Sequence, residues 1–105
     1  MRTTTAIQIS DRHRAIVNAI LAGVADRLGT IKVFGSRATG RARPSSDLDL
    51  VVYPPAPPDS LGDLRLAFEE SELPIFVDVI DWGSITLPRL REEIERDAID
   101  WIVEP

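Results

Sequence analysis

Hydrophobic residues along the chain recur with two different spacings, which predicts helices alternating with strands. Ile16, Ile20 and Val24 are spaced four residues apart between Ser10 and Gly29, which favour the start and the end of a helix. Short runs rich in β-branched and aromatic residues are typical of strands. The predicted order is a helix over 11–28, a strand over 30–34, a short helix over 37–40, a strand over 47–53, a helix over 61–71, a strand over 75–80 and a last helix that ends near residue 98.

This order predicts a single α+β domain over residues 1–105, with a sheet of three or four strands and helices packed mainly on one side. Leu48, Leu50 and Val52 share one side of their strand and are expected to face the core. Ser60 with Asp63 resembles a capping box at the start of the third helix. Further expectations are a short edge strand near residues 5–9, a short terminal strand at 101–103, a partly buried Leu66, and buried Leu61, Leu64, Phe68, Leu87, Leu90 and Ile94.

Three acidic residues interrupt the apolar runs that predict the strands. Asp47 and Asp49 are two residues apart, so their side chains point to the same side of a strand. Asp78 lies in the middle of the run IFVDVI, whereas Asp81 falls on the other face of that strand. A carboxylate in a half-buried strand position is costly unless it is paired, hydrogen-bonded or bound to a cation. The pattern favours a site for a divalent cation such as Mg²⁺ at Asp47, Asp49 and Asp78.

The first predicted strand ends at Gly35-Ser36, ten residues before Asp47. A glycine-led turn with free backbone N–H groups favours phosphate binding. Read alone, Gly-Ser is also an ordinary turn and helix cap, and we expect Ser36 to cap the short helix. The carboxylate pair downstream shifts the interpretation toward a site for a metal-bound nucleoside triphosphate.

The loop after Gly35-Ser36 carries three arginines and no acid before Asp47. A guanidinium group fits a phosphate well, and Arg37, which directly follows Ser36, is therefore predicted to bind the nucleotide. For Arg41 and Arg43 a solvated position and a phosphate contact are equally well supported. By contrast, the stretch from Glu92 to Glu104 is acidic, with Arg96 among its acids.

Composition excludes several kinds of protein. The 105 residues carry 12 basic and 17 acidic side chains, a net charge of −5, which argues against a broad nucleic-acid-binding surface. The chain has no cysteine and one histidine, so disulfides and histidine-rich metal sites are ruled out; His13 is expected on the surface. No apolar run approaches the length of a membrane span, and no signal-peptide core is present, so a cytoplasmic protein is expected.

The sequences GSRATGRARPSSDLDL and FVDVID together resemble the minimal nucleotidyltransferases of the DNA polymerase beta-like superfamily. The resemblance implies a nucleotidyltransferase fold, with a small mixed sheet like the palm of that polymerase. It also implies two Mg²⁺ ions, about 3.5–4 Å apart, that stabilise an in-line displacement. Gly35 and Ser36 would hold the triphosphate of ATP, Asp47 and Asp49 would ligate the metals, and Asp78 would complete the metal site and help to deprotonate the acceptor hydroxyl.

The stand-alone members of this family are paired with an all-helical HEPN protein, and the resemblance implies such a partner here. In those systems the nucleotidyltransferase is the antitoxin and transfers AMP to a tyrosine of the HEPN toxin. Two alternatives stay open on the sequence alone. The chain could transfer nucleotides to a small molecule held by a helical partner, or neutralise that partner by contact without catalysis.

Overall fold

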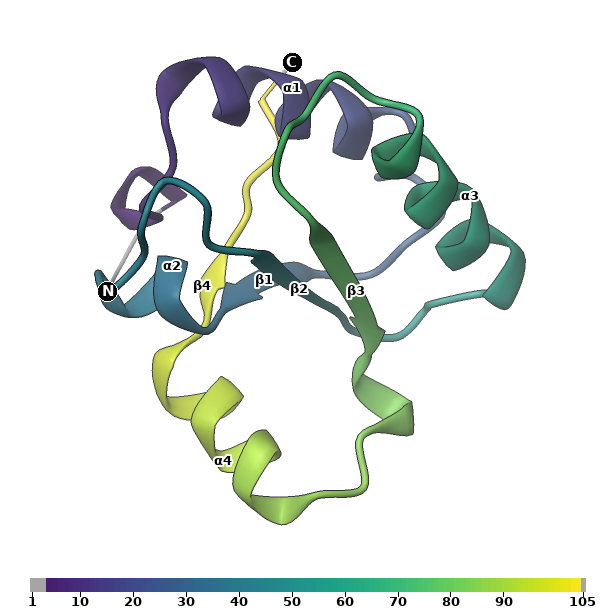
Figure 1. The fold of residues 1–105 in the computed structure, drawn as a ribbon. Coiled ribbons are helices and arrows are strands. Elements are labelled where there is room, and N and C mark those ends of the chain that lie inside the picture. Colours follow the sequence, from purple (N-terminus) through teal and green to yellow (C-terminus); the bar gives the residue numbers. More distant parts are fainter. Residues whose placement is uncertain (1–3, 105) are drawn as a thin grey trace.

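The computed structural model describes residues 4–104 and contains a four-stranded mixed sheet with the strand order β3-β2-β1-β4 (Figure 1). β1 pairs antiparallel with β2 and β4, and β2 pairs parallel with β3. The elements in chain order are a 3₁₀ turn at Thr4–Ala6, α1 at Asp11–Ala22, β1 at Ile31–Phe34, α2 at Ser36–Thr39, β2 at Leu48–Val52, α3 at Pro58–Glu69, β3 at Val77–Asp81, a second 3₁₀ turn at Trp82–Ser84, α4 at Pro88–Asp97 and β4 at Ile99–Asp100.

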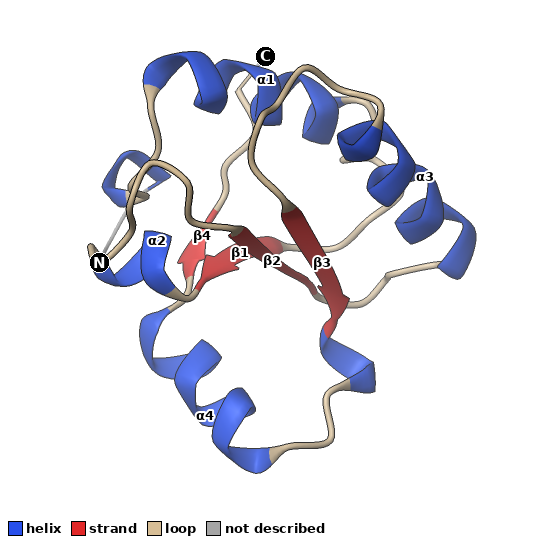
Figure 2. Ribbon diagram, viewed as in Figure 1, coloured by secondary structure: helices blue, strands red, loops and turns tan. Residues whose placement is uncertain are grey.

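α1 and α3 cover one face of the sheet, where the main core lies (Figures 1 and 2). Leu48, Leu50 and Val52 point into this core and are completely buried, as the two-residue alternation predicts. Val17 and Leu21 of α1 are equally buried. α3 supplies the crossover that a parallel β2–β3 pair requires, which explains why the one parallel pairing in the sheet joins these two strands.

α4 lies against the opposite face of the sheet and encloses a second, smaller core (Figure 1). Val51 and Ile94 meet there, while the ring of Trp82 stacks on Tyr53 with 4.9 Å between centroids. Arg91 of α4 lies over the other side of Trp82, with its guanidinium carbon 4.5 Å from the ring centroid, and it donates a hydrogen bond to the Trp82 carbonyl oxygen. These contacts fix α4 relative to the end of β3.

Several predicted boundaries are corrected by the backbone. The first helix ends at Ala22 instead of residue 28, because the Gly23 N–H bonds back to Ile20 and the chain continues in turns. The capping box is wrong: α3 begins at Pro58, two residues before Ser60, and no side chain caps it. Proline favours the first turn of a helix because its fixed φ suits that position. Asp63 instead forms an ion pair with Arg27 at 3.2 Å.

The predictions for the chain ends are also corrected. Residues 4–6 form a 3₁₀ turn where an edge strand was expected, and the last strand is Ile99–Asp100, ahead of residues 101–103. Leu87, which was expected to be buried, is 66% exposed, and Leu66, which was expected to be partly buried, is 51% exposed. Within residues 4–104, no helix combines the length and the apolar character needed to cross a bilayer.

Candidate active site

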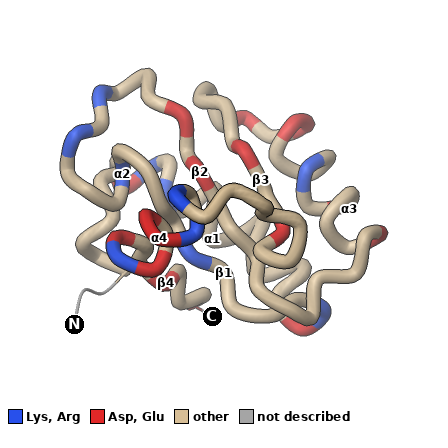
Figure 3. Tube along the Cα trace, turned by 90° about the horizontal axis from the view of Figure 1, so that it is seen from below, with Lys and Arg blue, Asp and Glu red and all other residues tan. Residues whose placement is uncertain are grey.

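β2 and β3 bring two of the predicted acidic residues together. Because the strands are parallel and in register, Asp49 lies directly opposite Asp78. Both share a strand face with residues two positions further on, Val51 and Ile80, which belong to the α4-side core. Figure 3 looks onto the α4 side of the molecule and shows acidic positions on both strands. Asp49 is half-buried, whereas Asp78 on the edge strand is exposed. The two carboxylates thus share one face of the sheet, which is the arrangement that a common site requires.

Asp47 lies just outside β2, which begins at Leu48. Its negative charge still affects the pKa of Asp49. Burial raises that pKa most, and the negative charges of Asp78 and Asp47 raise it further. The three acids therefore form one cluster of negative charge around the half-buried Asp49. Their individual roles in catalysis stay predictions.

Gly35 joins the turn after β1 to this cluster. Its φ of 74° lies in a region that residues with a side chain rarely adopt. A Cβ atom at this position would lie 2.5 Å from Asp49 Oδ2, which is too close for any other residue. Gly35, and not Ser36 as predicted, occupies the cap position of α2, and no side chain caps this helix. The backbone of the turn thus packs directly on the carboxylate.

Arg37 occupies a different place from the one predicted. Its side chain is 4% exposed and lies inside the loop. The guanidinium donates to the carbonyl oxygens of Ser46 at 2.8 Å, of Gln8 at 2.8 Å and of Pro44 at 3.2 Å. The role of Arg37 in nucleotide binding stays a prediction, and in this structure its donors hold together the loop that leads into Asp47. Burial lowers the pKa of Arg37, and the nearby charge of Asp47 opposes that change.

Gln8 completes the support of this loop, although no pattern in the sequence indicated such a role. Its side chain donates to the Ala42 carbonyl oxygen and accepts from the Ala42 N–H, both at 2.9 Å. The Gln8 backbone N–H donates to the Arg37 carbonyl oxygen at 2.8 Å. The segment before α1 therefore fastens both ends of the arginine-rich loop.

A cavity of about 340 Å³ opens between the Gly35-Ser36 turn and α4. Its lining residues are Phe34, Gly35, Ser36, Thr39, Arg41, Glu93, Arg96 and Asp97. Arg41 thus belongs to the site, whereas Arg43 lines a separate hollow beside His13. The three α4 residues were missed because they lie in an acidic stretch that reads as a solvated helix face. The only signal for them was a single arginine, Arg96, among those acids.

The acidic cluster suits Mg²⁺ by its chemistry. Asp49 and Asp78 offer adjacent oxygen ligands. The pKa of Asp49 is raised first by burial and then by the charges of Asp78 and Asp47, and a cation would offset those charges. Within residues 4–104 no group of three or more Asp, Glu, His or Cys side chains is arranged as a metal site. Mg²⁺ is usually held by one or two carboxylates together with substrate phosphates, so the pair fits this cation when a nucleotide completes the ligands.

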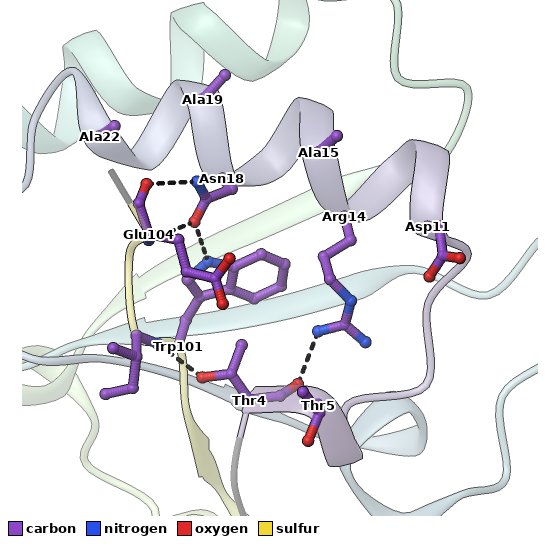
Figure 4. A pocket seen from close by; sticks show the side chains of 11 residues that line it. Thr4, Thr5, Asp11, Arg14, Ala15, Asn18, Ala19, Ala22, Trp101 and Glu104 are labelled. Carbon is purple, nitrogen blue, oxygen red and sulfur yellow. Dashed lines mark hydrogen bonds between the residues drawn. The ribbon is translucent and has the colours of Figure 1, made fainter.

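A larger cavity, of about 520 Å³, lies away from the acids, between α1 and the C-terminal segment (Figure 4). Here Asn18 accepts hydrogen bonds from the Trp101 indole N–H and the Glu104 N–H, and Arg14 lies over the Trp101 ring. Arg14 also donates to the carbonyl oxygens of Thr4 and Ile7. These polar groups fasten the two ends of the described chain to α1, which is a structural role.

Comparisons with known proteins show the family to which the chain belongs. Residues 17–101 match the family described as Nucleotidyltransferase domain. A protein of Haemophilus influenzae described as "Probable protein adenylyltransferase MntA" is 39% identical over 98 residues, which cover 91% of this chain and 84% of that protein. A solved structure described as a "putative minimal nucleotidyltransferase" is 38% identical, with a TM-score of 0.65, and the match covers 85% of this chain and 92% of that one.

A third similarity concerns the fold alone, because the identity is 21%. It is to the structure of a tri-AMPylated Shewanella oneidensis HEPN toxin in complex with an MNT antitoxin, with a TM-score of 0.58 over 85% of this chain and 71% of that one. The match of the family to residues 17–101 and the identity to the Haemophilus protein are decisive. This chain belongs to the nucleotidyltransferase domain family.

Proposed function

We propose that this protein transfers AMP from ATP to a hydroxyl group of a protein and releases pyrophosphate. The observation that carries the proposal is the pairing of Asp49 with Asp78 beside the Gly35-Ser36 turn. The 39% identity to a relative described as a protein adenylyltransferase supports AMP as the transferred group. By analogy with the AMPylated HEPN toxin bound to its MNT antitoxin, the acceptor is a tyrosine of a helical HEPN toxin, and this chain is the antitoxin.

In this proposal the chain's own residues have separate tasks. The backbone N–H groups at Gly35 and Ser36 bind phosphate oxygens of ATP, because the first N–H groups of α2 have no partner within the helix. The acceptor oxygen attacks the α-phosphorus, and the bond from that phosphorus to the bridging oxygen of pyrophosphate breaks. Asp78 accepts the proton of the hydroxyl group. Its position on the exposed edge strand leaves it accessible to a protein acceptor.

Asp47, Asp49 and Asp78 would hold two Mg²⁺ ions. When bound, Mg²⁺ supplies positive charge that offsets the charge developing on the phosphate oxygens. The half-buried carboxylate of Asp49 is oriented for such a ligand by the Gly35 backbone that packs on it. We also propose the cytoplasm as the location, since ATP and the toxin's targets are found there.

The test is to mix the protein with Mg²⁺, ATP labelled in the α-phosphate and the HEPN protein encoded next to it. We expect the label on a tyrosine of the HEPN protein, and none with the Asp47→Asn, Asp49→Asn double variant. Label on a small molecule bound to the partner would favour the two-component alternative. A double variant that still neutralises the toxin, with no labelling by the wild type, would overturn the enzymatic proposal in favour of binding alone.

A further inference from the structure

An ion pair on α4 faces the turn that is proposed to hold the triphosphate. Arg96 and Asp97 line the same cavity as Gly35 and Ser36. The Arg96 guanidinium donates from Nε to Asp97 Oδ1 at 3.1 Å and from Nη2 to Asp97 Oδ2 at 3.0 Å. The pair is thus bidentate, and it occupies a planar fork that would suit a phosphate group equally well.

This ion pair can be exchanged at little cost. The Arg96 side chain is 66% exposed and that of Asp97 is 27% exposed, and an ion pair made by a solvent-exposed arginine contributes little to stability. A triphosphate carries several negative charges, so it competes effectively with one carboxylate for the same guanidinium. Because α4 is fixed through Arg91 and Trp82, the exchange needs only a change in the Arg96 side chain.

We propose that Arg96 is a phosphate-binding residue of the nucleotide site and that Asp97 is its competing partner when no nucleotide is bound. The inference rests on the proposed function, because it needs the cavity to bind a nucleoside triphosphate. The three acids would hold Mg²⁺ in that proposal, and none of them lines the cavity that Arg96 shares with Gly35 and Ser36. Arg96 therefore contacts the phosphates that leave as pyrophosphate, and it favours ATP over AMP.

The experiment is calorimetric titration with the α,β-methylene analogue of ATP and, separately, with AMP, both in the presence of Mg²⁺. Arg96→Ala is expected to weaken binding of the analogue by about tenfold or more, since a charge-assisted hydrogen bond contributes about 1.5–3 kcal/mol. Binding of AMP should change by less than about twofold, because AMP lacks the phosphates concerned. Arg89→Ala is the matched control, since Arg89 is an exposed arginine of the same helix outside the cavity.

Asp97→Asn provides a change of opposite sign. The substitution weakens the Arg96–Asp97 interaction that competes with phosphate. Binding of the analogue should therefore tighten by about two- to fivefold, because an ion pair with an exposed arginine is weak. In the Arg96→Ala background the same substitution should tighten binding only as much as the removal of one negative charge does. Glu93→Gln removes a charge from the same cavity and measures how much tightening comes from charge alone.

The outcomes separate this inference from the proposed function. An Arg96→Ala variant that binds the analogue as tightly as the wild type overturns the role of Arg96 and leaves AMP transfer intact. An Asp97→Asn effect that is as large without Arg96 as with it, or that equals the Glu93→Gln effect, overturns the competition between Asp97 and phosphate. A wild-type protein that binds neither ligand overturns the proposed function and this inference together.

Discussion

The two faces of the sheet have different compositions and different tasks. On the α1–α3 face, strand β2 presents Leu48, Leu50 and Val52, which are completely buried in the main core. On the α4 face the same strand presents Asp49 beside Val51, and the core there is small. The hydrophobic effect stabilises the fold mainly through the first face. The second face is left open enough to place a charged cluster next to a cavity, which explains how so short a chain combines a stable core with a polar site.

The largest expected effect is on catalysis, from Asp49→Asn. Removal of outer partners of metal ligands already costs about 10–100-fold in activity, so the loss of a direct ligand should lower AMP transfer by about 10³-fold. The measurement is the rate of labelling of the partner protein. Thermal unfolding is the control, and we expect a midpoint equal to or above that of the wild type, because burial and two neighbouring acids disfavour the charged form of Asp49. A variant that labels at the wild-type rate would contradict the role of this face.

The adjacent residue should behave in the opposite way. Leu50→Ala removes side-chain atoms from the completely buried face, and we expect the free energy of unfolding to fall by about 2–5 kcal/mol in urea titrations. Per folded molecule, nucleotide affinity should change little, because the side chain points away from the acids. A selective loss of affinity in a fully folded Leu50→Ala protein would show that the two faces are not independent.

Arg37→Lys tests whether the loop depends on the shape of the guanidinium or only on its charge. Lysine keeps the positive charge near Asp47, but its three donors sit on a single nitrogen and cannot span the carbonyl oxygens of Ser46, Gln8 and Pro44 as the guanidinium fork does. We expect a loss of about 1–3 kcal/mol in the free energy of unfolding, the cost of buried groups left without partners. Unchanged stability with weaker ATP binding would restore the phosphate contact predicted from the sequence.

The sequence was sufficient where a single strand or turn decides the outcome. The two-residue alternation places Asp49 and Leu50 on opposite faces of β2. It also puts Asp78, and not Asp81, on the same face of the sheet as Asp49. It was insufficient where distant segments meet. Arg37 directly follows Ser36 in the chain, yet its donors reach the carbonyl oxygen of Gln8, 29 residues away. The position of Arg96 depends on how α4 returns across the sheet, which no local pattern contains.

The smallest expected effect is a pH dependence of stability that originates at Asp49. Its pKa in the folded protein is raised above the ordinary value of 3.8 by burial, by Asp78 and by Asp47, so the folded state holds this proton more tightly than the unfolded state does. Stability from this group is therefore fully present below pH 3.8 and is lost as the pH rises through the raised value.

Asp49→Asn has no such proton, so the difference in unfolding free energy between variant and wild type should grow in favour of the variant over that range. Urea titrations of both proteins at a series of pH values measure this difference, and other titrating groups cancel in the comparison. A difference that stays constant with pH would mean that Asp49 is no less favourable as an anion in the folded protein than in the unfolded chain. The charges on the α4 face would then cost no stability. The two faces of the sheet would differ only in the chemical character of their side chains.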